Sequence, residues 1–549
     1  MQSRIAIVGT GPTGVYVFKM LSEKLKGCAF SLFERGGQAG VGMPYSPENA
    51  DRSMLANIAS IEMPPVTTTY LAWLESLSAE RLKQYDLTHD DLHDRLFTPR
   101  LLVGEYFRDE FLTLCENAVN QGSRVTVSEQ TAVTDVTFES DSVYLVTRRG
   151  PSKTERREGP FDQIVLATGH DFPDEDEATR RYFPSPWLGL IQADIPAVSV
   201  GIMGTSLSSI DAAMAVVSQH GRFRASGDDL RFETDASGLH VTLMSWTGVL
   251  PEADFYCPLP YKPLEVMTAE AITKAAESAK PLDAMFVLLK QEIAQADPDY
   301  ARKIGLDDLT ADTVEHAYFA ARLAQDPFRW ARKNLAEVEK NKADKVTVAW
   351  RYALLRMHEK FEQIVPKLTE ADRERFDKGL KTVFVDNYAA VPSVSIRRLL
   401  ALRDAGVLSV MGLGEDYKLD HTPKGTVIMA KGQTHKFDVF IDARGQKPMT
   451  SKDLPFPSLR AAVLEAGQEI PETNGNFCLK GVAGYEGRVF LAALPWLMHD
   501  RPFVQGITAS AEMAEILAAA QPTQTGRPSA SQRRVADRAR NCQPAHCDR

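Results

Sequence analysis

The first forty residues alternate between apolar runs of strand length and a run with helical spacing. Arg4–Gly9 is a short apolar run that predicts a strand. Apolar residues then recur every three or four positions, as on one face of a helix, at Val15, Phe18, Leu21 and Leu25. A further apolar run, Ser31–Phe33, predicts the next strand. The chain start is therefore expected to form a strand–helix–strand unit.

The turn between the first strand and the helix is an unbroken G-x-G-x-x-G, made of Gly9, Thr10, Gly11, Pro12, Thr13 and Gly14. The first glycine permits a tight turn, the second lets a pyrophosphate approach the backbone, and the third lets helix and strand pack closely. Free N–H groups and the positive dipole end at the helix start favour phosphate. The motif therefore predicts a dinucleotide site; an ordinary glycine loop is the alternative.

An acidic residue ends the second predicted strand. Glu34 follows Phe33 and stands about 20 residues beyond Gly14, the separation typical of dinucleotide-binding folds. Its carboxylate can accept hydrogen bonds from ribose hydroxyls and would repel a 2′-phosphate. The first site is therefore expected to hold FAD or NAD rather than NADP.

A second, degenerate copy of the same pattern begins at Ala197–Met203, an apolar run of strand length. The turn after it contains Gly204, and Ser206 and Ser209 occupy the second and third glycine places. Serine fits near phosphate and can donate a hydrogen bond, so these three residues are candidates for a second nucleotide site. A structural strand–turn–helix without a ligand is the alternative. The following strand ends in Ser245-Trp246-Thr247, so the choice between NAD and NADP stays open.

Later apolar runs extend the α/β pattern. Strands are predicted at Phe161–Gly169, which ends in Ala-Thr-Gly, at Phe437–Gly445, and at Arg488–Ala493. Small residues at a strand end let the chain leave the sheet close to a bound nucleotide. A small antiparallel layer is predicted from Val125–Val127, Val133–Phe138 and Ser142–Arg148, and a charged turn from Pro151–Pro160.

The expected fold class is α/β, with two Rossmann-like dinucleotide-binding domains, the second inserted in the first. Amphipathic helices between about residues 258 and 378 predict a helical insertion in the second domain. We therefore expect four parts: residues 1–175 (FAD-binding domain, first part), 176–380 (NAD(P)-binding domain with the insertion), 381–520 (FAD-binding domain, second part) and 521–549 (a disordered, polar tail).

Composition narrows the class of protein. With 549 residues and a net charge of −10, the chain offers no broad basic field for nucleic acid. Six scattered cysteines without a C-x-x-C pair favour a reducing cytoplasm and argue against a dithiol reductase. No apolar run reaches the roughly 20 residues of a membrane span, so a soluble, cytoplasmic protein without membrane contact is expected. Cys542, His546 and Cys547 lack the further ligands of a zinc site, so no metal is predicted.

The order of these features resembles the flavoproteins with two dinucleotide-binding domains, and in detail the bacterial FAD/NAD(P)-binding proteins of the YdhS type. The match runs to about Ala520. The closer likeness is carried by Gly40–Tyr45, Leu55–Ser60, Gly201–Ser208, Pro251–Pro258, Asp386–Ala390 and Ala493–Asp500.

The resemblance implies FAD in the first domain and a nicotinamide dinucleotide, NAD(P)H, in the second. On that likeness Gly9, Gly11, Gly14 and Glu34 hold the ADP half of FAD. Arg100 and the predicted helix start at Gly506, Ile507 and Thr508 would approach the rest of the cofactor. From its position alone, Arg100 is either a phosphate or flavin contact or a surface arginine near a helix start.

The sequence departs from this resemblance in two places, one at an expected flavin contact and one at a motif of a monooxygenase subclass. Ala493-Leu494-Pro495 stands where many relatives carry a Gly-Asp pair that meets the flavin ribityl or phosphate groups. The segment Phe183–Gln192 lacks the histidine motif of Baeyer–Villiger-type monooxygenases.

The expected function is that of an FAD-dependent oxidoreductase that accepts hydride from NAD(P)H. It would pass electrons to oxygen, hydroxylating a small-molecule substrate, or to another small acceptor. Hydride transfer needs alignment rather than a protein acid or base, so no catalytic side chain is predicted. A flavin-holding sensor or assembly component with negligible turnover is the alternative. The substrate, the preferred nicotinamide and the oligomeric state stay open.

Overall fold

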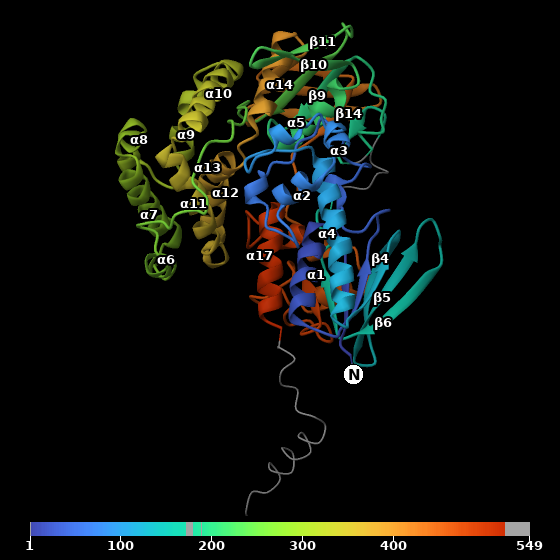
Figure 1. Ribbon diagram of the computed structural model, residues 1–549. Coiled ribbons are helices and arrows are strands. Elements are labelled where there is room, and N and C mark those ends of the chain that lie inside the picture. The colour runs from blue at the N-terminus through green and yellow to red at the C-terminus, as the bar shows by residue number, and fades with distance from the viewer. Residues whose placement is uncertain (1, 172–178, 188, 522–549) are drawn as a thin grey trace, which may run out of the picture.

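Two five-stranded parallel sheets organise the molecule, and the chain enters the second before it completes the first (Figure 1). The computed structural model describes residues 2–171, 179–187 and 189–521. The first sheet, in spatial order, consists of β18 (Val489–Leu491), β7 (Gln163–Leu166), β1 (Arg4–Val8), β2 (Ala29–Phe33) and β3 (Arg124–Ser128). The second consists of β13 (Leu408–Gly412), β12 (His240–Ser245), β9 (Ser199–Met203), β17 (Val439–Asp442) and β8 (Tyr182–Phe183).

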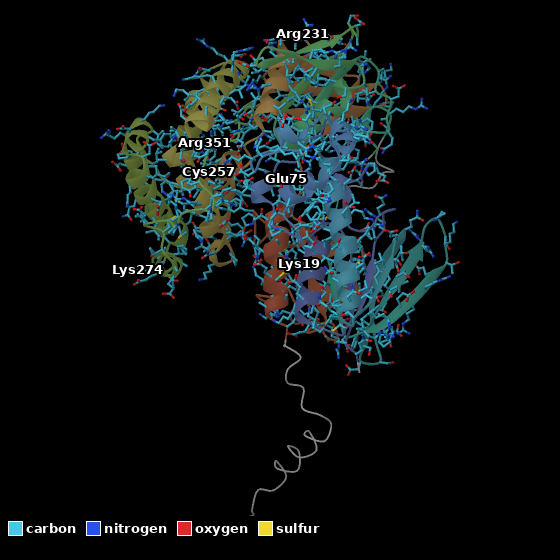
Figure 2. The ribbon with its side chains drawn as sticks, in the orientation of Figure 1. Lys19, Glu75, Arg231, Cys257, Lys274 and Arg351 are labelled. Carbon is cyan, nitrogen blue, oxygen red and sulfur yellow. The ribbon has the colours of Figure 1, made fainter. Side chains whose placement is uncertain are left out.

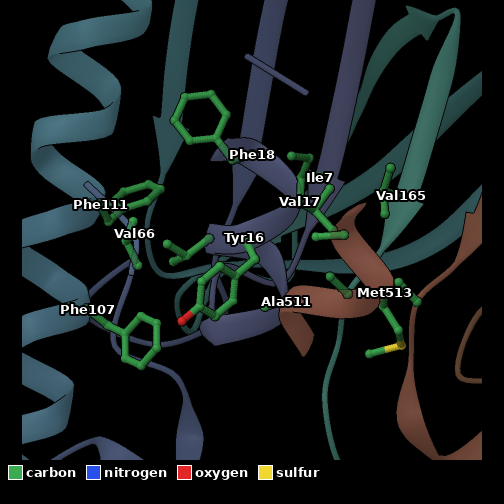
Figure 3. Packing of buried hydrophobic residues seen from close by; sticks show 14 of the residues in the cluster. Ile7, Tyr16, Val17, Phe18, Val66, Phe107, Phe111, Val165, Ala511 and Met513 are labelled. Carbon is green, nitrogen blue, oxygen red and sulfur yellow. The ribbon is translucent and has the colours of Figure 1, made fainter. Parts of the chain in front are cut away.

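Strand β1 shows how the sequence pattern builds the first domain. Side chains of a strand alternate between faces, and the last four residues of β1 are all buried. Ile5 and Ile7 pack into the core under α1 (Pro12–Lys24), α4 (Arg100–Asn120) and α17 (Gly506–Ala519), part of which Figure 3 shows. Ala6 and Val8 pack into a second core on the opposite face. A continuous apolar strand is therefore covered on both faces, as expected for a parallel sheet.

The opposite face of the first sheet is covered by an antiparallel layer of β4 (Thr131–Glu139), β5 (Ser142–Arg149) and β6 (Glu155–Phe161), with α15 (Pro457–Glu465). The second sheet is similarly placed between helices and strands. Its helices are α5 (Leu207–Val217) and α14 (Ser393–Asp404), and its antiparallel layer is β14 (Lys418–Thr422), β15 (Gly425–Ala430) and β16 (Gln433–Phe437). Smaller elements are α2 (Tyr70–Ser76), α3 (Ala79–Lys83), α16 (Leu494–Leu497), β10 (Gly221–Ser226) and β11 (Asp229–Thr234).

A helical insertion leaves the second domain after β12 and forms a separate group of helices beside both sheets, shown in olive in Figure 1. It has its own hydrophobic core. Its helices are α6 (Ala269–Ala276), α7 (Pro281–Ala296), α8 (Pro298–Lys303), α9 (Val314–Leu323), α10 (Pro327–Asp344), α11 (Ala349–Glu362), α12 (Glu370–Lys378) and α13 (Leu380–Tyr388).

An ion pair buried between the insertion and the second domain joins the two. Arg351 of α11 lies 2.9 Å from Glu252, and their side chains are 4% and 8% exposed. The same guanidinium stacks over Phe255, 4.4 Å from the ring centroid. Arg351 and Cys257 are both labelled in Figure 2 at this junction. Glu252 and Phe255 belong to the Pro251–Pro258 motif, which therefore anchors the insertion.

Three sequence expectations differ from the structure. The run at Val125–Val127 is expected in the antiparallel layer, but it forms β3 and pairs in parallel with β2. Alternation reveals a strand and not its partner, and this caused the error. The segment Pro151–Pro160 is expected to be a charged turn, yet most of it forms β6, paired with β5 while its charged side chains face solvent.

The third difference concerns the division of the chain at residue 381. Strands β13 and β17 pair into the second sheet, so the chain returns to the first sheet only after Asp442. The helices of the insertion also continue past the expected end at 378, through α13 to Tyr388. An apolar strand reads alike in either sheet, and register decides which sheet it joins. Of the tail expected from residue 521, only Gln521 lies within the described residues.

Candidate functional site

A cleft opens at the carboxyl ends of the strands of the first sheet, where ligands bind in α/β folds. Its empty volume, open solvent included, is about 1310 Å³. We call it the first-sheet cleft. Its walls come from the glycine turn, the acid after β2, the end of β7, the start of α17 and two loops; they include Gly9, Gly11, Pro12, Thr13, Glu34, Tyr45, Thr131, Val133, Thr168, Gly169, His170, Leu494, Trp496, Gly506 and Ile507.

The glycine turn forms a cradle that only backbone can line. Gly9 has a φ of +89°, and a Cβ added to Gly14 would lie 2.1 Å from the Gly9 carbonyl oxygen. A Cβ on Gly11 would lie 3.2 Å from the Cα of Gly42, on the loop across the cleft. No side chain caps the first turn of α1, so its N–H groups are available to an anion. This geometry fits the diphosphate of a dinucleotide.

Glu34 holds the turn as well as facing the cleft. One carboxylate oxygen accepts hydrogen bonds from the backbone N–H and the hydroxyl of Thr10, at 3.0 and 2.8 Å. The other accepts from the N–H of Gly36 at 2.7 Å. The structure therefore brings Glu34 beside the predicted phosphate turn, where an acid can reach a ribose.

The end of the first-sheet cleft beside the start of α17 is formed by residues from distant parts of the chain. Gly506, with a φ of +91°, and Ile507 line it at the start of α17. Thr508 is exposed and is not part of this lining. Leu494, from the Ala493-Leu494-Pro495 segment, and Trp496 add an apolar wall.

Sequence reasoning missed His170, which lines this end directly after Thr168-Gly169. Burial lowers the pKa of its imidazole to about 4, although a hydrogen bond with Gln446 opposes the shift. The ring is therefore neutral at physiological pH. Its position after the Ala-Thr-Gly strand end was the signal that could have identified it.

The structure does not bring Arg100 to the lining of the first-sheet cleft. Its guanidinium donates to one carboxylate oxygen of Asp211 on α5, from Nε at 3.0 Å and Nη2 at 2.8 Å. The side chains of the pair are 12% and 7% exposed. Burial raises the pKa of the Asp211 carboxyl, and the Arg100 charge opposes that shift. Arg100 thus links the two nucleotide domains; a cofactor contact remains a prediction.

The second turn brings Gly204, Ser206 and Ser209 together between β9 and α5. Gly204 has a φ of +126°, and a Cβ on it would lie 2.2 Å from the Ser209 hydroxyl oxygen. Ser209 is 1% exposed. Ser206 precedes the helix without a side-chain capping bond, so the first N–H groups of α5 are not satisfied by its hydroxyl. The turn follows the same strand–turn–helix path as the first one, with serines in the second and third glycine places, of which Ser209 is packed against Gly204.

Comparison with known proteins assigns the class. Residues 6–171 match the family described as FAD-NAD(P)-binding. The ornithine N-hydroxylase of Kutzneria sp. 744 has the same fold, with a TM-score of 0.50 at 14% identity over 94% of this chain and 98% of that chain. Ornithine hydroxylase PvdA of Pseudomonas aeruginosa matches less closely, with a TM-score of 0.47 at 10% identity over the same shares. The chain thus shares its fold with this N-hydroxylase and carries an FAD-NAD(P)-binding domain at residues 6–171.

A closer relative identifies the family. "Uncharacterized protein YdhS" of Escherichia coli (strain K12) is 50% identical over 523 residues, covering 94% of this chain and 97% of the relative. Residues 268–388, which include every helix of the insertion, match the YdhS-like middle domain. The chain belongs to the YdhS family.

Residues 2–171, 179–187 and 189–521 contain neither a membrane-spanning helix nor a cluster of metal ligands. No helix there is long and apolar enough to cross a bilayer. Within the same ranges, no group of three or more His, Cys, Asp or Glu side chains is placed to hold a metal ion. Cys542, His546 and Cys547, rejected as zinc ligands from the sequence, lie outside these ranges.

Proposed function

We propose that this protein oxidises NAD(P)H with FAD held in the first-sheet cleft. The electrons then pass to oxygen, with hydroxylation of a small molecule, or to another small acceptor. The observation that carries the proposal is the cradle at Gly9, Gly11 and Gly14, which closes to backbone on every side that a Cβ would occupy. The match to the FAD-NAD(P)-binding family supports it.

In this proposal each wall of the cleft has a physical role. The N–H groups at the start of α1 bind the diphosphate, and Thr10, Pro12 and Thr13 complete the turn around it. Glu34 accepts hydrogen bonds from the adenosine sugar. Thr131 and Val133 lie beyond Glu34 in the lining and would flank the adenine. FAD, when bound, supplies the hydride-accepting chemistry.

The other end of the cleft would hold the reactive ring. The start of α17, a helix of 14 residues, presents its positive dipole end there and favours negative charge on the bound ring. Leu494 and Trp496 exclude water from the same end. His170, held neutral by burial, is placed to exchange a hydrogen bond without bringing a charge. Thr508 lies between the lining residues Ile507 and Ser510 without lining the cleft itself, so its contact with the cofactor stays a prediction.

The second turn is proposed to receive the nicotinamide dinucleotide at Gly204, Ser206 and Ser209. Its support is the repeated strand–turn–helix arrangement and the N–H groups at the start of α5 that Ser206 leaves available. The acceptor is proposed to be a small molecule. The ornithine N-hydroxylase that shares the fold carries out hydroxylation of one such compound, as its name states.

Anaerobic mixing of FAD-loaded protein with NADH and, separately, NADPH tests the proposal. Rapid bleaching of the flavin absorbance with either nucleotide is the expected result. A flavin that binds but does not bleach would instead favour the sensor or assembly role. Repeating the reaction in air while measuring peroxide separates the two fates of the electrons, because a reductase that leaks to oxygen releases peroxide without substrate.

A further inference from the structure

One side chain of the first domain is buried inside the helical insertion. Phe503 lies between β18 and α17, yet it is 7% exposed and belongs to the core formed by α6–α13. Its ring centroid lies 5.4 Å from His358 of α11 and 5.9 Å from both Phe384 and Tyr388 of α13. It lies 6.1 Å from Phe376 of α12. Phe503 is therefore part of the hydrophobic core of the insertion, although in sequence it belongs to the first domain.

Polar contacts from the insertion hold the backbone on either side of Phe503. Arg373 of α12 donates a hydrogen bond to the carbonyl oxygen of His499, and its Nη2 lies 3.6 Å from the Asp500 carboxylate. Glu362 of α11 accepts a hydrogen bond from the N–H of Phe503 at 3.3 Å. The segment of residues 498–505, which we call the linker, is therefore bound to two helices of the insertion.

The linker is also continuous with one wall of the first-sheet cleft. It follows α16, which contributes Leu494 and Trp496 to that wall, and it precedes Gly506, which begins α17. The Trp496 indole N–H donates to the Thr450 carbonyl oxygen at 3.0 Å, which fixes this wall to the first domain.

The linker is held by both parts of the molecule. His499 forms a hydrogen bond with the Met449 carbonyl oxygen at 3.0 Å, and Val504 packs in the first-domain core. Arg373, Glu362 and the place of Phe503 add fixed points from the insertion.

We propose that the helical insertion positions the flavin end of the first-sheet cleft, by holding the linker through Phe503 and Arg373. These two are positioning residues, since neither lines the cleft and each acts through Trp496 and Gly506. The inference rests on the proposed function in so far as FAD is the ligand whose site is shaped. It also gives the insertion a role in cofactor binding, because a change in the insertion reaches the cofactor through the short stretch of backbone from Phe503 to Gly506.

The test compares two arginines on the same helix. Arg373 and Arg375 are equally exposed, 30% each, but Arg375 pairs only with Asp283, Asp312 and Asp372 of the insertion. Arg373→Gln is expected to raise the FAD dissociation constant about tenfold, the effect of one such contact on an equilibrium. It should also reduce the visible circular dichroism of the bound flavin. Arg375→Gln, which damages the insertion more, should leave both unchanged.

A second pair of variants tests the buried ring. Phe503→Leu should weaken FAD binding as Arg373→Gln does, whereas Phe286→Leu of α7, in the same core, should leave it at the wild-type value. Unchanged affinity and dichroism in both linker variants would overturn the inference and leave the proposed function standing. Wild-type protein that binds no FAD would overturn the proposed function instead.

Hydrogen exchange keeps the inference testable without cofactor. In the apo protein, Arg373→Gln should accelerate amide exchange across residues 494–507, and Arg375→Gln should not. Equal protection of these amides in wild type and Arg373→Gln would show that the insertion does not fix this wall.

Discussion

The two strand–turn–helix units of this chain share a backbone path and differ in what fills it. In the first unit a Cβ on Gly14 would strike the Gly9 carbonyl; in the second, the matching position carries Ser209, whose hydroxyl lies against Gly204. The second helix is therefore held off its strand by a side chain. The first unit thus requires glycine at both positions, whereas the second requires it only at Gly204, since Ser209 occupies the other place.

The resemblance extends to the strand that lies beside each turn, β7 in the first sheet and β17 in the second. Gly9 faces the Ala167 carbonyl at the end of β7, and Gly204 faces the Ala443 carbonyl at the end of β17. The glycines two residues beyond, Gly169 and Gly445, have φ values of +72° and +82°. The segments that follow these two glycines are in contact, because the side-chain oxygen of Gln446 accepts a hydrogen bond from the Asp171 N–H at 2.9 Å. Each domain thus carries the same turn at its carboxyl edge, and the edges touch.

The largest expected effect comes from adding one methyl group to the first turn. In Gly14→Ala the new Cβ would lie 2.1 Å from backbone, so the helix must move away from the strand. We expect FAD binding to fall by at least about a hundredfold, since more than one phosphate contact is lost. Measuring the flavin content and FAD affinity of the purified variant checks this.

Ser209→Ala is the matched control in the second turn. It removes a hydroxyl from a place where a Cβ already stands, so FAD binding and the melting temperature should stay close to wild type. Equal loss of flavin in both variants would mean that the two turns are not as different as their packing indicates.

Among the effects on folding stability, the largest should come from a buried ion pair at the domain junction. Position 211 is a buried aspartate paired with Arg100, while the matching position of α1 is the buried Tyr16. Asp211→Ala leaves the Arg100 charge buried without its partner, which costs on the order of 3–5 kcal/mol of unfolding free energy. Chemical unfolding of the variant measures this cost.

The double variant Arg100→Met with Asp211→Leu separates charge burial from domain contact. It should recover most of the stability, because a buried pair is replaced by apolar groups. It also tests the prediction that Arg100 approaches the cofactor. FAD affinity close to wild type in the folded double variant would reject that prediction.

A feature of the fold or the site could be predicted from the sequence when its residues lie close together along the chain. Gly9, Gly14 and Glu34 act within one strand–helix–strand unit, so their order along the chain was enough to predict where they lie. Arg100 is the opposite case. Its partner Asp211 lies on another domain, and no local pattern announces a contact 111 residues away in sequence.

The same distinction explains the errors in the fold. The partner of β3 and the sheet joined by β17 are decided by register between distant segments. Phe503 reads as an ordinary apolar residue before a helix, although it belongs to the core of the insertion. The sequence therefore predicted most of the elements and the glycine turn, whereas the junctions between domains could be found only in the structure.

The acid after the second strand should have a moderate effect. Glu34 accepts three hydrogen bonds that hold the turn, whereas the residue after the matching strand β12 is the half-exposed Trp246. Glu34→Ala should weaken FAD binding by roughly thirtyfold, about 2 kcal/mol, because charge-assisted bonds and a sugar contact are lost. Trp246→Ala is the control, and its FAD affinity should match wild type in titrations followed by flavin fluorescence. A Glu34→Ala variant that binds FAD normally would remove the acid from the site.

The smallest expected effect concerns the contact between the segments that follow β7 and β17. Burial lowers the pKa of His170 to about 4. Gln446, in the segment after β17, and Arg100, at the start of α4, face the imidazole. A histidine with a lowered folded pKa stabilises the protein above about pH 6.5, and that contribution is lost as pH falls toward 4. Unfolding free energies measured at pH 7.5 and 5.5 should therefore differ by about 1.4 kcal/mol more in wild type than in His170→Asn, which cannot take up the proton. Identical pH dependence in wild type and His170→Asn would mean that the imidazole takes up its proton as readily in the folded protein as in the unfolded chain. The contact between the segments after β7 and β17 would then not exclude a charge.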